Sequence, residues 1–261
     1  MRLSIGARCA WPVFIALMLA YLTAPLALVI LFSFNRSALT SFPVTGLTLD
    51  WYRRLALNES FWPALQNSLI VGAAVAAVAV TVGLLAALAL ARMTEGKAQA
   101  LLDVLSAPMM LPALIIGVAL LSFFVRTIAL PLGLMTVILG QLVVIAPFVI
   151  AILFARLSSF DWSLVESARD LGATPVQAFR TITLPLIRPS LVGSALIALS
   201  LSLDDFVITF FTIGSGNTLP TLVWGLVRTT LDPTINAIAT LLLALSVGST
   251  ILALKVIDYR R

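Results

Sequence analysis

The stretch LQNSLIVGAAVAAVAVTVGLLAALALA, Leu65 to Ala91, contains no charged residue. It belongs to a longer uncharged segment that runs from Ser60 to Ala91, between Glu59 and Arg92. An α-helix needs about 20 apolar residues to cross the ~30 Å hydrocarbon core of a bilayer. The stretch therefore predicts a transmembrane helix, and its many glycines and alanines favour close packing against neighbouring helices.

The composition extends this prediction to the rest of the chain. Of its 261 residues, 61% are hydrophobic and 10% are charged, and the mean hydropathy is +1.12. Soluble domains carry about 25% charged residues, so a soluble fold is excluded. A membrane β-barrel would show segments of ~10 residues with alternating hydrophobicity. Here the other uncharged stretches are as long as a membrane helix, at 9–35, 104–125, 127–155 and 233–254.

We therefore expect an all-α membrane protein, with residues 1–261 forming a single transmembrane domain. The six helices are expected at about 11–34, 65–91, 103–125, 132–155, 189–213 and 235–257. The first apolar run, Cys9 to Asn35, has 27 residues and ends in the bulky sequence LVILFSF. A secretory signal has an apolar region of only ~7–15 residues followed by small residues, so this run is interpreted as a retained first helix.

The basic residues predict the orientation, because cytoplasmic loops are enriched in Lys and Arg. If the N-terminus is cytoplasmic, eleven of the 16 basic residues lie inside and five lie outside. We therefore expect both termini to be cytoplasmic. The inside set is Arg2, Arg8, Arg92, Lys97, Arg156, Arg169, Arg180, Arg188, Lys255, Arg260 and Arg261, and the outside set is Arg36, Arg53, Arg54, Arg126 and Arg228. Within the outside segment 214–234, Leu219 to Leu231 is expected to form a short surface helix.

The residues that most often carry enzyme chemistry are scarce. Cys9 is the only cysteine and histidine is absent, which removes an internal disulfide, a Cys-rich metal site and the commonest general base. A phosphate-binding Walker A loop needs G-x-x-x-x-G-K-[ST]. The one Gly-Lys pair, Gly96-Lys97, has Ala91 at the first glycine position and is followed by Ala98. We expect no catalytic residue, no metal and no ATPase site in this chain.

The longest inside loop, residues 156–188, reads RLSSFDWSLVESARDLGATPVQAFRTITLPLIR. The sequence SLVE predicts a capping box with Ser163 as the N-cap of a short helix, which ends at Gly172. The sequence TPVQ predicts a second capping box, at Thr174, with Pro175 as the first helical residue. Two ordered helices with apolar side chains indicate a docking surface for another molecule. The alternative is a helix that lies on the lipid surface, to which Arg169 and Arg180 would also be suited.

The spacing within this loop resembles the EAA loop of bacterial ABC importer permeases. That family pattern is E-A-A, three residues, G, nine residues and I-x-L-P. The matching residues here are Glu166, Ser167, Ala168, Gly172, Ile182, Leu184 and Pro185, with Ser167 in place of the first alanine. Hydroxymethyl and methyl side chains differ little in size. The resemblance implies that the helix from Glu166 to Gly172 is a coupling helix that enters a cleft on an ATPase.

A resemblance to the polyamine-type permeases, the putrescine and spermidine importer subunits, extends over nearly the whole chain. The motifs that carry it are LTLDWYRRL (47–55), LGATPVQAFRTITLPLIRPSL (171–191), LSLDDFVITFF (201–211) and LPTLVWGLVRTTLDPTINAIATLLL (219–243). It implies a type I ABC importer bundle in the bacterial inner membrane. The implied partners are a second, homologous permease subunit, a cytoplasmic ATPase dimer that binds ATP and Mg²⁺, and a periplasmic solute-binding protein. No cofactor is implied in this chain, and no nucleic acid.

Two adjacent acids, Asp204 and Asp205, lie within the fifth expected helix. Asp204 is 15 residues beyond Pro189, or about 22 Å along a helix at 1.5 Å per residue, in the outer half of the bilayer. An ionisable group at this depth costs ~2.5–3.5 kcal/mol on insertion scales and is a functional candidate. One interpretation is a pathway for a cationic solute, and the other is a helix break with Asp204 as the N-cap of an outer half-helix. The two can coexist.

Trp51 and Tyr52 are further candidates for the solute pathway, because an ammonium group within ~6 Å of an aromatic face gains ~0.5–2 kcal/mol. Anchoring at the membrane interface explains them equally well. The favoured function is the permease subunit of an ATP-driven importer for a small cationic solute, with a polyamine as the expected cargo. An ATP-driven importer for an amino acid, an opine-like compound or iron remains an alternative. A less favoured alternative is an ion channel or a secondary transporter.

Overall fold

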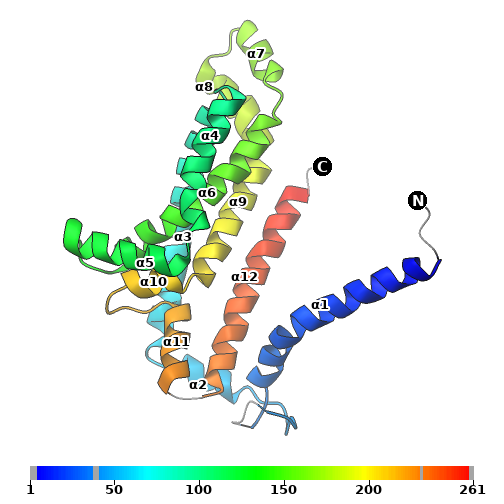
Figure 1. The fold of residues 1–261 in the computed structure, drawn as a ribbon, viewed down its shortest axis with the longest axis vertical. Helices are drawn as coiled ribbons and strands as arrows, with labels where there is room; N and C mark the ends of the chain where they lie inside the picture. Colours follow the sequence, from blue (N-terminus) through cyan, green and yellow to red (C-terminus); the bar gives the residue numbers. More distant parts are fainter. Residues whose placement is uncertain (1–4, 38–40, 230–231, 259–261) are drawn as a thin grey trace. The chain divides into compact units, whose positions relative to one another are not determined.

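A computed structural model describes residues 5–37, 41–229 and 232–258, which are almost entirely helical (Figure 1). The chain forms two compact units. One unit contains the described residues of 1–59 and 223–241, and the other contains those of 60–222 and 242–261. The second unit holds both the loop at 156–188 and the acids at 204 and 205.

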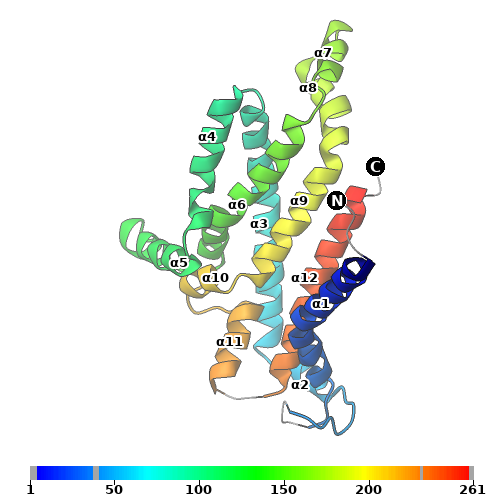
Figure 2. The same cartoon turned by 45° about the vertical axis from the view of Figure 1, so that its right-hand side comes forward.

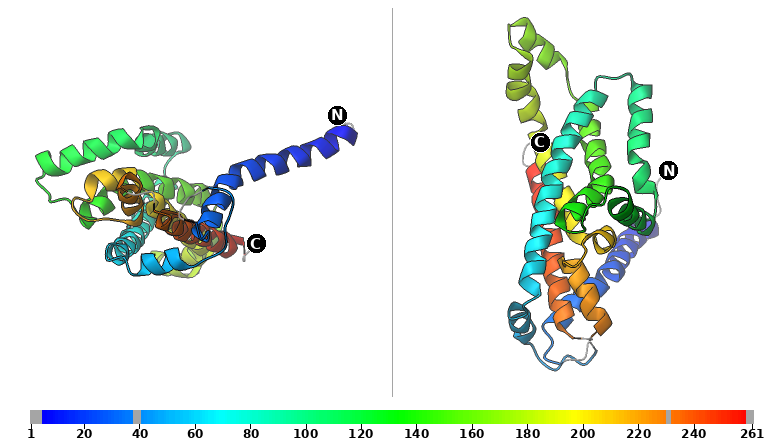
Figure 3. Two further views of the ribbon diagram at one scale, coloured as in Figure 1. Left: turned by 90° about the horizontal axis from the view of Figure 1, so that it is seen from below. Right: turned by 90° about the vertical axis from the view of Figure 1, so that its left-hand side faces the viewer.

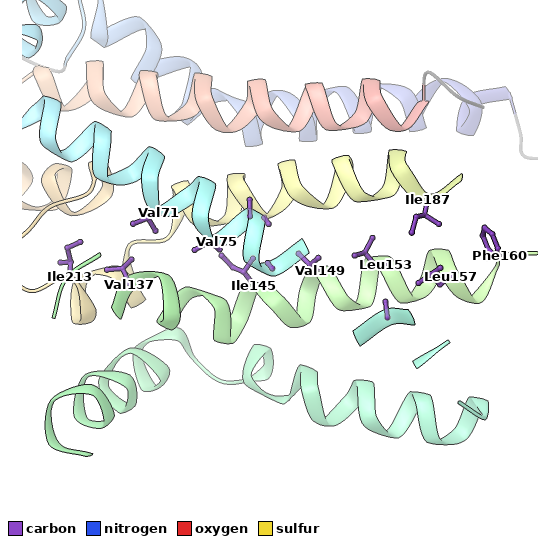
Figure 4. Close-up of a cluster of buried hydrophobic side chains, with 14 residues drawn as sticks. Val71, Val75, Val137, Ile145, Val149, Leu153, Leu157, Phe160, Ile187 and Ile213 are labelled. Atoms are coloured by element: carbon purple, nitrogen blue, oxygen red, sulfur yellow. The ribbon is translucent and has the colours of Figure 1, made fainter. Parts of the chain in front are cut away.

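The core of the second unit consists of α3 (Phe61–Leu90), α6 (Leu134–Ser158) and α9 (Leu184–Asp204), which pack along one another (Figure 1). Their buried apolar side chains form one cluster, which Figure 4 shows in close-up. Val75 of α3, Val149 of α6 and Ile187 of α9 lie in this cluster. The small residues of α3 allow this approach: a Cβ on Gly83 would lie 2.8 Å from Val149 Cγ1.

Five helices are long and apolar enough to cross a membrane, or six if a bent pair is counted as one span. The five are Trp11–Ser33, Phe61–Leu90, Leu134–Ser158, Pro175–Asp204 and Thr234–Leu252. The described residues form no strand, and their one β-bridge, Asn35 to Leu47, is isolated. The long apolar helices and the lack of strands in this part of the chain confirm the expected all-α membrane class.

The third expected helix, 103–125, is wrong as a single straight helix. The chain instead forms α4 (Glu95–Ser106) with a short 3₁₀ turn at Ala107–Met110, followed by α5 (Ala113–Ser122) with a π-helical turn at Phe123–Thr127. The two halves are bent by 91° (Figure 3). Proline explains the bend: Leu111, which precedes Pro112, has an extended backbone with ψ 143°, as residues before proline usually do.

The fifth expected helix, 189–213, also differs. The helical run begins earlier, at Pro175, and ends at Asp204. It consists of α8 (Pro175–Ala178), a π-helical turn at Phe179–Thr183, and α9. Asp205 has an extended backbone, with ψ 114°, and a separate helix α10 (Val207–Thr212) follows, packed against α5 (Figure 2).

The first unit contains α1 (Ile5–Ser33), α2 (Asp50–Ala56), most of α11 (Leu219–Thr229) and the first part of α12 (Thr234–Asp258). The expected surface helix, Leu219 to Leu231, is therefore α11, and residues 230–231 lie outside the described residues. Arg2, Arg260 and Arg261, used for the orientation, also lie outside them.

Substitution Gly83→Ala should lower the thermal midpoint of the detergent-purified protein. The added methyl would meet Val149, whose β-branched side chain is buried in the core and cannot move away easily. Such overpacking costs about 1–3 kcal/mol. Gly248→Ala in α12 is the matched control, because nothing lies within 4 Å of its Cβ position. Equal midpoints for the two variants would contradict this packing of α3 on α6.

Candidate functional site

The loop at 156–188, which we call the coupling loop, contains α7 (Ser163–Asp170) and α8 and projects beyond the ends of α3 and α6 (Figure 3, right). The expected end of α7 at Gly172 is confirmed. Gly172 has a φ of +91°, its amide donates to Arg169 O, and the amide of Ala173 donates to Ala168 O. These two bonds form a Schellman motif, which favours glycine because a side chain is strained at such a φ.

The second expected capping box is confirmed and the first is wrong. The amide of Thr174 donates to Gln177 Oε1 at 2.8 Å, and the amide of Gln177 donates to Thr174 Oγ1 at 3.3 Å. At α7 the N-cap is Trp162, without a side-chain cap. Asp161 Oδ1 instead accepts from the amide and the hydroxyl of Ser163, at 3.0 and 2.7 Å. The Asp161 carboxylate thus bonds Ser163 at the start of α7, and the amide of Glu166 donates to Trp162 O instead of to the Ser163 hydroxyl.

The coupling loop has two apolar faces with different environments. On the inner face, Trp162, Val165 and Ile182 pack against the core cluster of α3, α6 and α9. On the outer face, Leu171 is 90% exposed and Val176 is 60% exposed. The outer face is thus open to contact with another molecule, while the inner contacts tie the loop to the helices.

The acids lie at the break between α9 and α10 (Figure 2). Asp205 Oδ2 accepts from the amide and the hydroxyl of Thr209, at 3.0 and 2.9 Å, and from Gln141 Nε2 at 3.3 Å. Gln141 is buried in α6; its amide group also donates to Thr209 Oγ1 at 2.9 Å and accepts from the Ser202 hydroxyl. The expectation that Asp204 is the N-cap of the outer half-helix is therefore wrong: the N-cap of α10 is Phe206, and the carboxylate that bonds the first turn is that of Asp205, one residue earlier.

Asp204 forms its hydrogen bond with α12 and none with α10 among the described residues. Its Oδ1 accepts from the hydroxyl of Ser246 in α12, at 2.7 Å. One turn earlier on α9, the Ser200 hydroxyl bonds Ser246 O at 3.3 Å and the Ser249 hydroxyl. Asp204 is exposed, and no Lys or Arg among the described residues forms an ion pair with it.

Both acids line one pocket of about 350 Å³, which we call the acid pocket. Its lining residues are Met109, Gln141, Val144, Ile145, Phe148, Leu201, Asp204, Asp205 and Ile208. The lining is mostly apolar, and the two carboxylates are the only charged groups among the described residues that form it.

Trp51 and Tyr52 lie in the first unit, on α2, and both side chains already have partners there. Trp51 is buried, its Nε1 donates to Asn35 O at 2.6 Å, and the Arg54 guanidinium lies 4.9 Å from its ring centroid. The Tyr52 hydroxyl bonds the Ser33 hydroxyl at 2.8 Å. These contacts explain both aromatics as structural residues of this unit, and a role in solute passage stays a prediction.

Residues 79–260 match the family model described as the binding-protein-dependent transport system inner membrane component. The chain belongs to this family. It is 36% identical over 244 residues to the putrescine transport system permease protein PotI of Escherichia coli K12, covering 90% of this chain and 86% of that one. It is 34% identical over 241 residues to the spermidine/putrescine transport system permease protein PotC of Haemophilus influenzae, covering 92% and 93%.

Solved structures with the same fold include a bacterial ABC transporter that imports alginate, with a TM-score of 0.72, 16% identity and coverage of 96% of this chain and 97% of that one. The MetNI methionine ABC transporter gives a TM-score of 0.58, 21% identity and coverage of 82% and 99%. The resemblance to ABC importer permeases is thus confirmed, and with it the function class of an inner membrane transport component.

Sequence reasoning found the two acids but missed the residues that bind them, Gln141, Thr209 and Ser246. The one available signal was a polar side chain in an otherwise apolar helix, as at Gln141 in ILGQLVV. Such residues are expected to face the bundle interior and to bond another polar group.

Gln141→Leu should lower the thermal midpoint of the purified protein. The variant leaves the buried Ser202 hydroxyl without its acceptor and removes one donor from Asp205, at a cost of about 1–3 kcal/mol. Gln99→Leu serves as the control, because Gln99 is exposed and bonds only Asp103 on its own helix, α4. A Gln141→Leu midpoint equal to that of Gln99→Leu would show that the network contributes nothing to stability.

Proposed function

We propose that this chain is the permease subunit of an ATP-driven importer that carries a small cationic solute, a polyamine such as putrescine or spermidine, across the inner membrane. The observation that carries the proposal is the acid pocket, which holds two carboxylates and no cation among the described residues. Since an unneutralised carboxylate at membrane depth is costly, a cationic solute is the natural occupant. The similarity to PotI and PotC supports a polyamine as that solute.

ATP is hydrolysed on a separate subunit in this proposal. The coupling loop receives the ATPase, with Glu166 to Gly172 as the coupling helix and Leu171 and Val176 as apolar contacts. Ser167, Ala168, Ile182, Leu184 and Pro185 complete the motif. The complex also contains a second, homologous permease and a periplasmic solute-binding protein. ATP and Mg²⁺ belong to the ATPase, and the present chain acts as one transmembrane domain with both termini in the cytoplasm.

One continuous helical run connects the coupling loop to the acid pocket. Residues Pro175–Asp204 form this run of 30 residues, made of α8, a π-helical turn and α9, which is long and apolar enough to cross a membrane. At 1.5 Å per residue it is about 45 Å long. A displacement of the loop by the ATPase dimer is therefore transmitted along α9 to Asp204 and Asp205, which opens the pathway alternately to each side. Trp51 and Tyr52 stay proposed residues of the solute pathway.

Expressed with a tag in its native host, the chain should copurify with an ATPase subunit and a second permease. Proteoliposomes that contain this complex, ATP and the solute-binding protein should take up labelled putrescine or spermidine. Uptake should stop without ATP, and an uncharged solute of similar size serves as the control. A chain that purifies without any ATPase, or a complex that transports no polyamine, would contradict the proposal.

Gly172→Val should reduce both uptake and ATP hydrolysis stimulated by the binding protein. Valine is strained at a φ of +91°, by about 1–2 kcal/mol, which lowers the population of correctly folded loop by a factor of about 5–30. Gly96→Val on the neighbouring α4 is the matched control, since neither glycine has an atom within 4 Å of its Cβ position and only Gly172 has a positive φ. Equal losses in both variants would mean that the coupling-loop geometry is not required.

A further inference from the structure

We propose that the two adjacent acids have different roles: Asp204 binds an ammonium group of the solute, and Asp205 is a positioning residue that holds the helix break and the pocket in shape. This inference rests on the proposed function, and it assigns the roles that the sequence leaves open. The apolar lining beside the carboxylates adds a reason, independent of the similarity to known permeases, for an alkylammonium solute.

Asp205 is engaged by the protein itself. Its Oδ2 receives three hydrogen bonds, two from Thr209 in the first turn of α10 and one from Gln141 in α6. The Thr209 amide is one of the backbone donors that the break leaves without a helical partner. A hydrogen-bond acceptor is all that this position needs, and asparagine caps a helix about as well as aspartate does.

Asp204 has one bond only, from the neutral Ser246 hydroxyl to Oδ1. Its Oδ2 has no hydrogen-bond partner among the described residues, and its side chain is exposed to the acid pocket. One neutral donor compensates poorly for a carboxylate in a membrane protein. The Ser246 contact fixes the direction of the carboxylate, so the oxygen that remains is positioned for a cation that enters the pocket.

The lining of the acid pocket selects the kind of cation. Mg²⁺ keeps most of its water and Ca²⁺ takes six to eight oxygen ligands, but the pocket offers few oxygens. Met109, Ile145, Phe148 and Leu201 instead provide apolar contacts for an alkyl chain next to the carboxylate. An aromatic face such as that of Phe148 also favours an ammonium group. The arrangement therefore fits a primary ammonium on an aliphatic chain better than an inorganic ion.

The test separates the need for a charge from the need for an acceptor, by use of four variants in the complete complex in proteoliposomes. Asp204→Asn and Asp205→Asn remove one charge each and keep the shape, whereas Asp204→Ala and Asp205→Ala also remove the acceptor. We expect Asp204→Asn to raise the KM for putrescine about tenfold or more, the loss of one charge-assisted bond, with an unchanged thermal midpoint. Asp205→Asn should keep uptake within about twofold of wild type, and Asp205→Ala should lower the midpoint.

Three outcomes would overturn the assignment. Wild-type KM in Asp204→Asn would show that its charge does not bind the solute. An equal loss in both asparagine variants at full stability would show that both charges bind it. An unchanged midpoint in Asp205→Ala would show that Asp205 positions nothing. If the wild-type complex moves no polyamine, the proposed function fails, while the midpoints of the two alanine variants still decide the positioning role.

Discussion

The fold around the acid pocket depends on the hydrogen bonds that Thr209 and Gln141 donate to the Asp205 carboxylate. A break in a membrane helix leaves backbone groups that water cannot satisfy, so other protein groups must bond them. Asp205 does this for α10, and the buried amide of Gln141 connects the break to α6 through Asp205, Thr209 and Ser202. These bonds stabilise the break at which Asp204 and Asp205 line the acid pocket.

In the proposed mechanism, a displacement of the coupling loop by the ATPase reaches the acid pocket along α9. The coupling loop is fixed to the core cluster by Trp162, Val165 and Ile182, and it continues into α9 without an intervening flexible segment. A packed core transmits displacement because its side chains fill the space at near-crystalline density. The helix α9 thus connects the coupling loop at one end to Asp204 at the other, and it packs against α3 and α6 through the core cluster (Figure 4).

The parts that could be predicted from sequence are those that local properties determine. Uncharged length predicts most of the membrane spans, and the short coupling-loop helices follow from the left-handed Gly172 and from the Thr174 to Gln177 bonds, which join neighbouring residues. The sharp bend after Leu111 was missed because prolines are often tolerated inside membrane helices.

The roles of Asp204 and Asp205 were harder to predict because their partners are remote. Gln141 lies 64 residues from Asp205, and Ser246 lies 42 residues from Asp204. Adjacent residues on a continuous helix point about 100° apart, but the extended backbone at Asp205 changes that relation. Tertiary contacts therefore decide which carboxylate bonds the first turn of α10 and which one is left to face the pocket.

In the proposed mechanism, the acid pocket opens alternately to the two sides of the membrane under the control of ATP. Because Cys9 is the only cysteine, Cys9→Ser gives a background in which Leu201→Cys places a single thiol in the pocket lining, where Leu201 is 39% exposed. The direct measurement is the labelling of this thiol in proteoliposomes by a membrane-impermeant reagent from each side. We predict labelling from the cytoplasmic side without nucleotide and from the opposite side when the ATPase dimer is trapped with ATP. Labelling from the same side in both states would contradict the account.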